Sequence, residues 1–159
     1  MNITIICMGK LKEAYWREAA AEYGKRLGKY CGLSIVELKE ARLPDKASPK
    51  EEDAVKQAEG TNILRHIQED QYVIALEIKG NPLTSEKLAD KIAALGMAGR
   101  GEVAFIIGGS LGLSEEVSRR ADYSLSFSNM TFPHQMMRVI LLEQIYRSFK
   151  ISKGETYHK

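Results

Sequence analysis

Hydrophobic positions along this chain follow two alternating periods. Short apolar runs, which are typical of buried strands, occur at 3–9, 33–39, 72–78, 102–108 and 123–127. Between and after these runs, apolar residues recur at helical spacing. The pattern predicts helices at 13–30, 54–67, 86–95, 115–121 and 134–150.

The order of these elements predicts an α/β fold. Strands that alternate with helices form a mostly parallel sheet with helices on both faces, because parallel strands need long crossover connections. The polar segment 40–53 contains proline and is expected to be a loop, and 79–85 is expected to be a turn. Residues 1–159 show no internal repeat, and their number suits one domain.

The last predicted helix is apolar around most of its circumference. Nine large apolar side chains between Met136 and Phe149 do not gather on one stripe, so the helix must be buried on more than one side. The sheet can cover one side, and a second subunit is a natural cover for another. We therefore expect a homodimer with Ile145 in its interface. A helix buried wholly within one chain is the alternative.

The composition and the first residues of the chain argue against a membrane-spanning or secreted protein. No apolar stretch approaches the roughly 18 residues that a membrane span needs, and no basic region precedes the first apolar run. We expect a soluble cytoplasmic protein. Cys7 and Cys31 have no pairing framework, so they are expected to be reduced side chains, and no metal site is expected.

Charge is concentrated at the two ends of the chain. Residues 1–30 carry six basic and three acidic residues, and residues 134–159 carry five and two. The middle of the chain, 31–133, is acidic, with twelve basic and sixteen acidic residues. If the fold brings the two ends together, they form one positive face that suits a polyanion. Ordinary solvated helix faces explain the charges equally well.

Three turns follow strands at the carboxyl edge of the expected sheet, where α/β proteins bind ligands. They are the turn after 76–78, the glycine-rich turn 108–112 and the hydroxyl-rich loop 126–133. The three glycines of the second turn permit close approach of backbone to a ligand. Pro133 suits the start of the helix that follows.

The glycine-rich turn also allows a serine hydrolase hypothesis. The sequence "GGSLG" matches a nucleophile elbow, and Ser110, Asp122 and His134 follow in the chain order of a hydrolase triad. However, a helix should begin almost at the serine of an elbow, whereas Ser114 is the better helix cap here. The chain has neither the G-x-G-x-x-G of a dinucleotide site nor the Lys-Ser/Thr of a P-loop.

Several separated motifs together resemble one family. They are "MGKLKEAYWREAAAEYGKRL", "IIGGSLGL", "LSFSNMTFPHQMMRVILLEQIYR" and the terminal "YHK". They are similar to the ribosomal RNA large-subunit methyltransferase H family of the SPOUT superfamily. The resemblance implies a C-terminal trefoil knot and a homodimer. It also implies S-adenosylmethionine-dependent methylation of ring nitrogen N3 of a pseudouridine in large-subunit (23S) ribosomal RNA, on the assembled ribosome.

The resemblance also implies site residues. The cofactor site would comprise Leu76, Gly108, Phe127, Ser128, Asn129, Met130, Thr131 and Phe132. The C-terminal tail of one subunit would lie over the other subunit's cofactor site. A frayed terminus is the alternative for the tail, and a noncatalytic ribosome-binding module remains the third functional class beside the methyltransferase and the hydrolase.

Four side chains are candidates for work on the RNA substrate. His158 is a candidate base because imidazole titrates near neutral pH, and Tyr157 could stack on a nucleobase. Arg138 could hold a substrate phosphate or base, with a helix-surface salt bridge as the alternative. His134 could orient substrate or cofactor, with a structural hydrogen bond as the alternative.

Overall fold

Five strands form a single parallel sheet in the computed structural model, which describes residues 1–159. The strand order is β2-β1-β4-β3-β5, and every neighbouring pair is parallel. The bounds are β1 Asn2–Met8, β2 Gly32–Leu38, β3 Tyr72–Pro82, β4 Glu102–Ile107 and β5 Tyr123–Ser126. The α/β fold with a parallel sheet is therefore confirmed.

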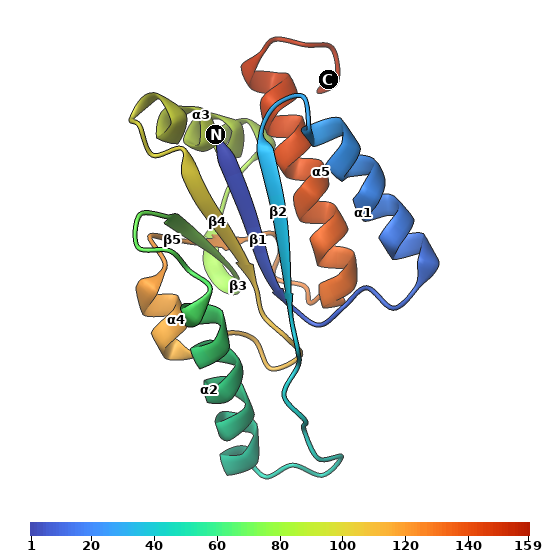
Figure 1. Cartoon of the computed structure of the whole chain (residues 1–159), viewed down its shortest axis with the longest axis vertical. Coiled ribbons are helices and arrows are strands. Elements are labelled where there is room, and N and C mark those ends of the chain that lie inside the picture. The colour runs from blue at the N-terminus through green and yellow to red at the C-terminus, as the bar shows by residue number, and fades with distance from the viewer.

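Helices cover both faces of the sheet (Figure 1). Side chains from α1 (Ala14–Leu27), α3 (Ser85–Met97) and α5 (His134–Ser152) pack in one core cluster with Ile5 and Phe105. Those from α2 (Pro49–Arg65) and α4 (Glu115–Arg120) pack in a second cluster with Ile6 and Ile106. Odd and even residues of the central strands point to opposite faces, so each strand contributes to both cores.

Helix α2 begins earlier than its apolar pattern predicts. Ser48 caps the helix by accepting a hydrogen bond from the backbone N–H of Glu51, whose side chain returns to the Ser48 backbone. Pro49 occupies the first turn, where its missing N–H is not needed. The capping box therefore turns the second part of the expected loop 40–53 into helix.

Strand β3 continues as far as Pro82, into the first part of the turn expected at 79–85. It pairs with β5 up to Leu76, loses register, and pairs again from Asn81 to Pro82. Residues 77–80 are the irregular part of this pairing. Such irregularities bend a strand and redirect its side chains, and here they give the carboxyl end of β3 an uneven edge.

Helix α5 lies on the sheet between α1 and α3. Its Leu141, Leu142 and Ile145 are completely buried. The expectation that Ile145 faces a partner is therefore wrong, because Ile145 belongs to the core of the single chain. Met136 and Ile140 are only half-buried and are not part of that core cluster, so they lie on the outer side of α5.

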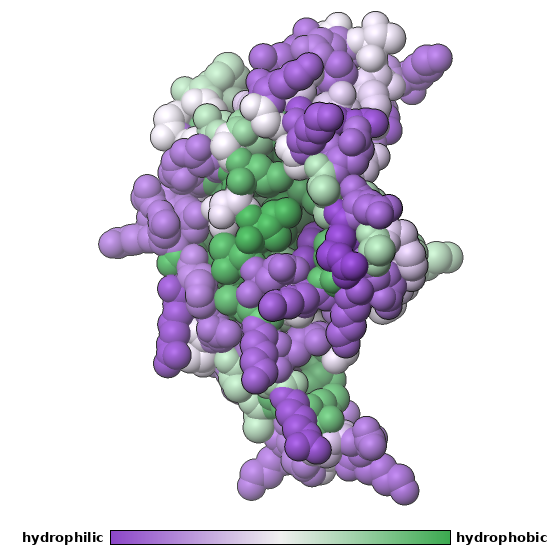
Figure 2. All heavy atoms as spheres, turned by 45° about the vertical axis from the view of Figure 1, so that its right-hand side comes forward, coloured by the Kyte–Doolittle hydropathy of each residue, from purple (hydrophilic) through white to green (hydrophobic).

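The surface is mixed rather than uniformly polar. On the face shown in Figure 2, apolar side chains gather near the middle and hydrophilic side chains surround them. Exposed large apolar side chains include Ile35 on the edge strand β2 and Met130 in the loop after β5. None of the helices is both long and apolar enough to cross a membrane.

Candidate functional site

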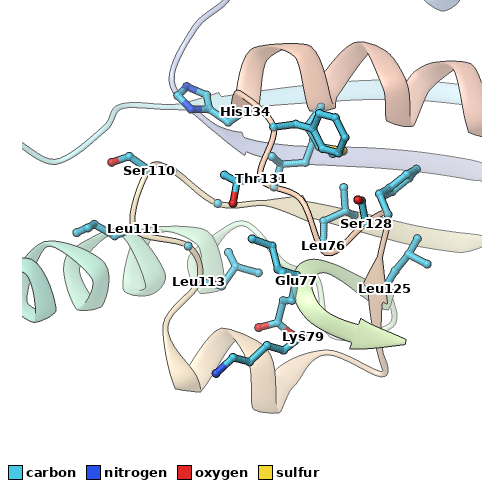
Figure 3. Close-up of a pocket in the computed structure, with 18 of the residues that line it drawn as sticks. Leu76, Glu77, Lys79, Ser110, Leu111, Leu113, Leu125, Ser128, Thr131 and His134 are labelled. Carbon is cyan, nitrogen blue, oxygen red and sulfur yellow. The ribbon is translucent and has the colours of Figure 1, made fainter. Parts of the chain in front are cut away.

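The principal cavity lies beyond the carboxyl ends of β3, β4 and β5 and has a volume of about 540 Å³. Its walls are the three turns that the sequence singles out, because the strands that precede them are neighbours in the sheet. Figure 3 shows Leu76, Leu113 and Thr131 converging from these three segments. A cavity of this size suits a small organic ligand.

Most of the candidate cofactor residues line the cavity. They are Leu76, Gly108, Phe127, Ser128, Met130, Thr131 and Phe132. Asn129 is exposed and is not among the lining residues. Three charged lining residues, Lys56, Glu77 and Lys79, were not predicted. Lys56 comes from α2, and no local sequence signal places that helix beside the glycine-rich turn.

The glycine-rich turn is held by its own backbone. The N–H of Gly112 donates to the carbonyl of Gly109 over 3.1 Å, and Gly112 has a φ of 81°, which favours glycine. A Cβ atom at Gly108 would come within 3.0 Å of the backbone carbonyl group of Gly112. The packing of the turn itself therefore favours glycine at position 108, before any ligand is considered.

Serine hydroxyls fix the loop after β5. The Ser126 hydroxyl donates to the carbonyl of Ile78 over 2.9 Å, which ties this loop to the irregular end of β3. The Ser128 hydroxyl accepts the backbone N–H of Met130 over 3.0 Å. Met130 and Phe132 nevertheless remain 74% and 36% exposed. The loop therefore holds two apolar side chains at the cavity without burying them.

Glu77 connects three elements beneath the cavity. Its carboxylate accepts hydrogen bonds from the Ser118 hydroxyl of α4 and, over 2.5 Å, from the Ser124 hydroxyl of β5. Both carboxylate oxygens are thus engaged within the chain. Glu77 therefore fixes the cavity wall by accepting one hydrogen bond at each carboxylate oxygen.

His134 and Arg138 occupy different positions although they are one helical turn apart. His134 lines the cavity, with its Nε2 atom 3.4 Å from the Glu40 carboxylate. Arg138 is 1% exposed and is not a lining residue. Its guanidinium donates to Glu37 over 2.6 Å and to the carbonyl of Gly9 over 2.9 Å. This arrangement buries the Arg138 guanidinium in an ion pair inside the chain, which is neither an exposed phosphate contact nor the helix-surface salt bridge considered as its alternative.

The residues of the hydrolase hypothesis do not form a triad. Asp122 accepts the backbone N–H of Val73 over 2.8 Å and lies near Arg120, outside the cavity lining. His134 faces Glu40 instead of Asp122. In Figure 3 the Ser110 hydroxyl is not directed at the His134 ring. Without an imidazole directed at its hydroxyl, Ser110 has no base to activate it.

The C-terminal tail folds back on α5 instead of reaching the cavity of its own chain. The Tyr157 hydroxyl donates to Glu143 over 3.1 Å, and burial raises the pKa of Tyr157 to about 12. The His158 ring contacts Arg147 over 3.1 Å and Glu86 over 2.8 Å. Glu143 is nine residues beyond His134, or about 13 Å along the helix. These side-chain contacts hold the tail against α5 and the start of α3.

Comparison with known proteins identifies the family. A family described as "Predicted SPOUT methyltransferase" matches residues 1–158. The chain belongs to this family. Its relatives include proteins named ribosomal RNA large subunit methyltransferase H from Clostridium novyi (strain NT), at 60% identity, and Alkaliphilus oremlandii (strain OhILAs), at 58%. Both similarities span 159 residues and 100% of each chain, which confirms the resemblance read from the sequence motifs.

Solved structures show the same fold for this SPOUT methyltransferase. A putative methylase family protein from Neisseria gonorrhoeae superposes with a TM-score of 0.57 at 16% identity, covering 99% of this chain and 86% of that one. A probable methylase family protein from Haemophilus influenzae Rd KW20 gives 0.52 at 15% identity, covering 96% and 66%. At such low identity these similarities concern the fold alone.

Proposed function

We propose that this SPOUT methyltransferase transfers a methyl group from S-adenosylmethionine to ring nitrogen N3 of a pseudouridine in a stem-loop of large-subunit ribosomal RNA. The assembled ribosome in the cytoplasm is its proposed substrate. The observation that carries the proposal is similarity over the whole chain, at 54–60% identity, to relatives named for methylation of this RNA. The cavity at the carboxyl edge of the sheet supplies the site.

The cavity walls fit a nucleoside cofactor. Leu76, Met130 and Phe132 offer apolar surface to an adenine ring, and the turn 108–112 exposes backbone groups that read its polar edge. The bound cofactor would supply an electrophilic methyl group on its sulfonium. The work of this chain is then to hold the donor, to exclude water with the loop 127–132, and to align the acceptor nitrogen.

The acceptor nitrogen carries a proton that must leave. His134 is the imidazole that lines the cavity of its own chain, and its Nε2 atom is already near Glu40. Tyr157 and His158 lie outside this cavity. We therefore assign the tail to the cavity of a partner subunit, where His158 would accept the proton and Tyr157 would contact the RNA base.

A homodimer follows from this assignment. The half-buried Met136 and Ile140 on the outer side of α5 provide an apolar surface that a second copy of the chain can cover. The trefoil knot of the C-terminal segment is the topology proposed for the chain from the family resemblance. It would pass the segment after β5 through an earlier loop, at the place where the cavity is built.

Labelled methyl transfer tests the proposed function. Ribosomes from a strain that lacks this modification are incubated with the protein and S-adenosylmethionine carrying a labelled methyl group. We expect one methyl group per large-subunit RNA, mapped by mass spectrometry to N3 of a single pseudouridine. Calorimetric titration with S-adenosylmethionine should show binding without RNA. Labelling of another base, or no labelling by a protein that binds the cofactor, contradicts the proposal.

A further inference from the structure

A second, basic pocket of about 370 Å³ lies between the C-terminal ends of α1 and α5. Arg26 and Lys29 line it from the end of α1, and Lys150 and Lys153 line it from the end of α5. The two helices lie side by side in Figure 1. The fold therefore joins the basic ends of the chain, which are separated by more than a hundred residues of acidic sequence.

An internal carboxylate already occupies this pocket. Glu155 accepts a hydrogen bond from the Tyr30 hydroxyl over 2.7 Å and forms an ion pair with Lys150. Lys150 and then Tyr30 lower the pKa of Glu155, because both stabilise its ionised form. Lys29 and Lys153 are exposed and form no salt bridge within the chain. The pocket is therefore built around an anion and retains unpaired positive charge.

The aromatic rings of the pocket are not free to stack on a base. The Tyr30 ring is stacked on Phe149 with centroids 5.6 Å apart, and the Lys153 ammonium lies 5.3 Å from the centre of the Tyr30 ring. Arg26 and Lys150 lie 5.8 and 5.9 Å from the centre of the Tyr146 ring. The pocket thus offers cations and a phenol hydroxyl, which recognise a phosphate group and not a nucleobase.

We propose that this pocket binds a backbone phosphate of the substrate RNA in place of the Glu155 carboxylate. The inference rests on the proposed function, because a tail that reaches the partner's cavity brings the pocket beside the RNA bound there. Glu155 begins the segment that carries Tyr157 and His158. Displacement of Glu155 by phosphate would also release one of the contacts that hold this segment against its own chain.

Binding of large ribosomal subunits at several salt concentrations tests the pocket. The double variant Lys29→Gln/Lys153→Gln should bind about tenfold more weakly at low salt, since it loses two phosphate-facing charges. The slope of log affinity against log salt should fall by about one to two. The control Lys46→Gln/Lys50→Gln removes the same charge from exposed positions around the start of α2. Equal weakening in both pairs, or no weakening in the first, overturns the proposal.

A second variant tests displacement of the carboxylate. Glu155→Gln should bind the subunits several-fold more tightly, because phosphate no longer competes with an internal anion. Unchanged or weaker binding overturns this step. All variants should retain the cofactor affinity of the unmodified protein, which shows that they are folded. Because the readout is binding, it still reports on the pocket if the unmodified protein fails to methylate RNA, and that failure would refute only the proposed function.

Discussion

At the scale of single residues, the glycine-rich turn allows its packing and its hydroxyl chemistry to be tested by different substitutions. Gly108→Val should weaken S-adenosylmethionine binding by about 10- to 100-fold, because the added side chain meets the backbone of Gly112 and distorts the cavity wall. Calorimetry measures this loss. Ser110→Ala is the matched control and should retain methyl transfer. A folded Ser110→Ala protein without activity would restore a catalytic role for that hydroxyl.

Arg138 is expected to matter for stability. Arg138→Met leaves the Gly9 carbonyl and Glu37 without their partner, at a cost of about 2 to 3 kcal/mol in the free energy of unfolding. This is below the cost of breaking a fully buried pair, because the Glu37 side chain is 35% exposed. Urea denaturation checks the value. Arg119→Met, which breaks an exposed pair with Glu115, should leave the urea midpoint nearly unchanged, because solvent screens that pair.

At the scale of elements, α5 has two apolar sides with different roles. Ile140→Asp should give a folded monomer that lacks methyl transfer, because the outer side of α5 then carries a charge in the proposed interface. Ile145→Asp should prevent folding, because an unpaired carboxylate would be buried in the core of one chain. Sedimentation velocity and circular dichroism distinguish the two. If the unmodified protein sediments as a monomer, the proposed dimer is contradicted.

At the scale of the whole molecule, the tail and the cavity are separate within one chain, and the proposed activity needs them together. Deletion of Tyr157, His158 and Lys159 should lower methyl transfer by about 100-fold or more, as for the loss of a catalytic base. Cofactor binding should be unchanged, since these residues do not line the cavity. Single-turnover methylation of ribosomes measures the loss. If the truncated protein reacts at the normal rate, the base is elsewhere, and His134 is the next candidate.

The helices, the strands and the edge of the sheet at which the site lies could be predicted from local sequence patterns. Strand and helix periods are local properties of the sequence. In a parallel sheet the turns that follow the strands lie at one edge, so the order of the elements is enough to predict that edge. The turns after 76–78, at 108–112 and at 126–133 could therefore be selected before the fold was known, and the family resemblance then pointed to Leu76, Gly108 and 127–132 within them. The capping box at Ser48 is also a local signal. It was missed because the apolar pattern of α2 begins several residues later than the helix itself.

Which side chains these elements bring together depends on how the elements pack in three dimensions. The burial of Ile145 and the pairing of Arg138 with Glu37 depend on where α5 crosses the sheet, and no spacing along the chain encodes that position. Lys56, Glu77 and Lys79 reach the cavity through the packing of α2 and the irregular end of β3. The basic pocket likewise exists because α1 and α5 pack side by side, since contacts between residues far apart in sequence are set by burial of the whole core.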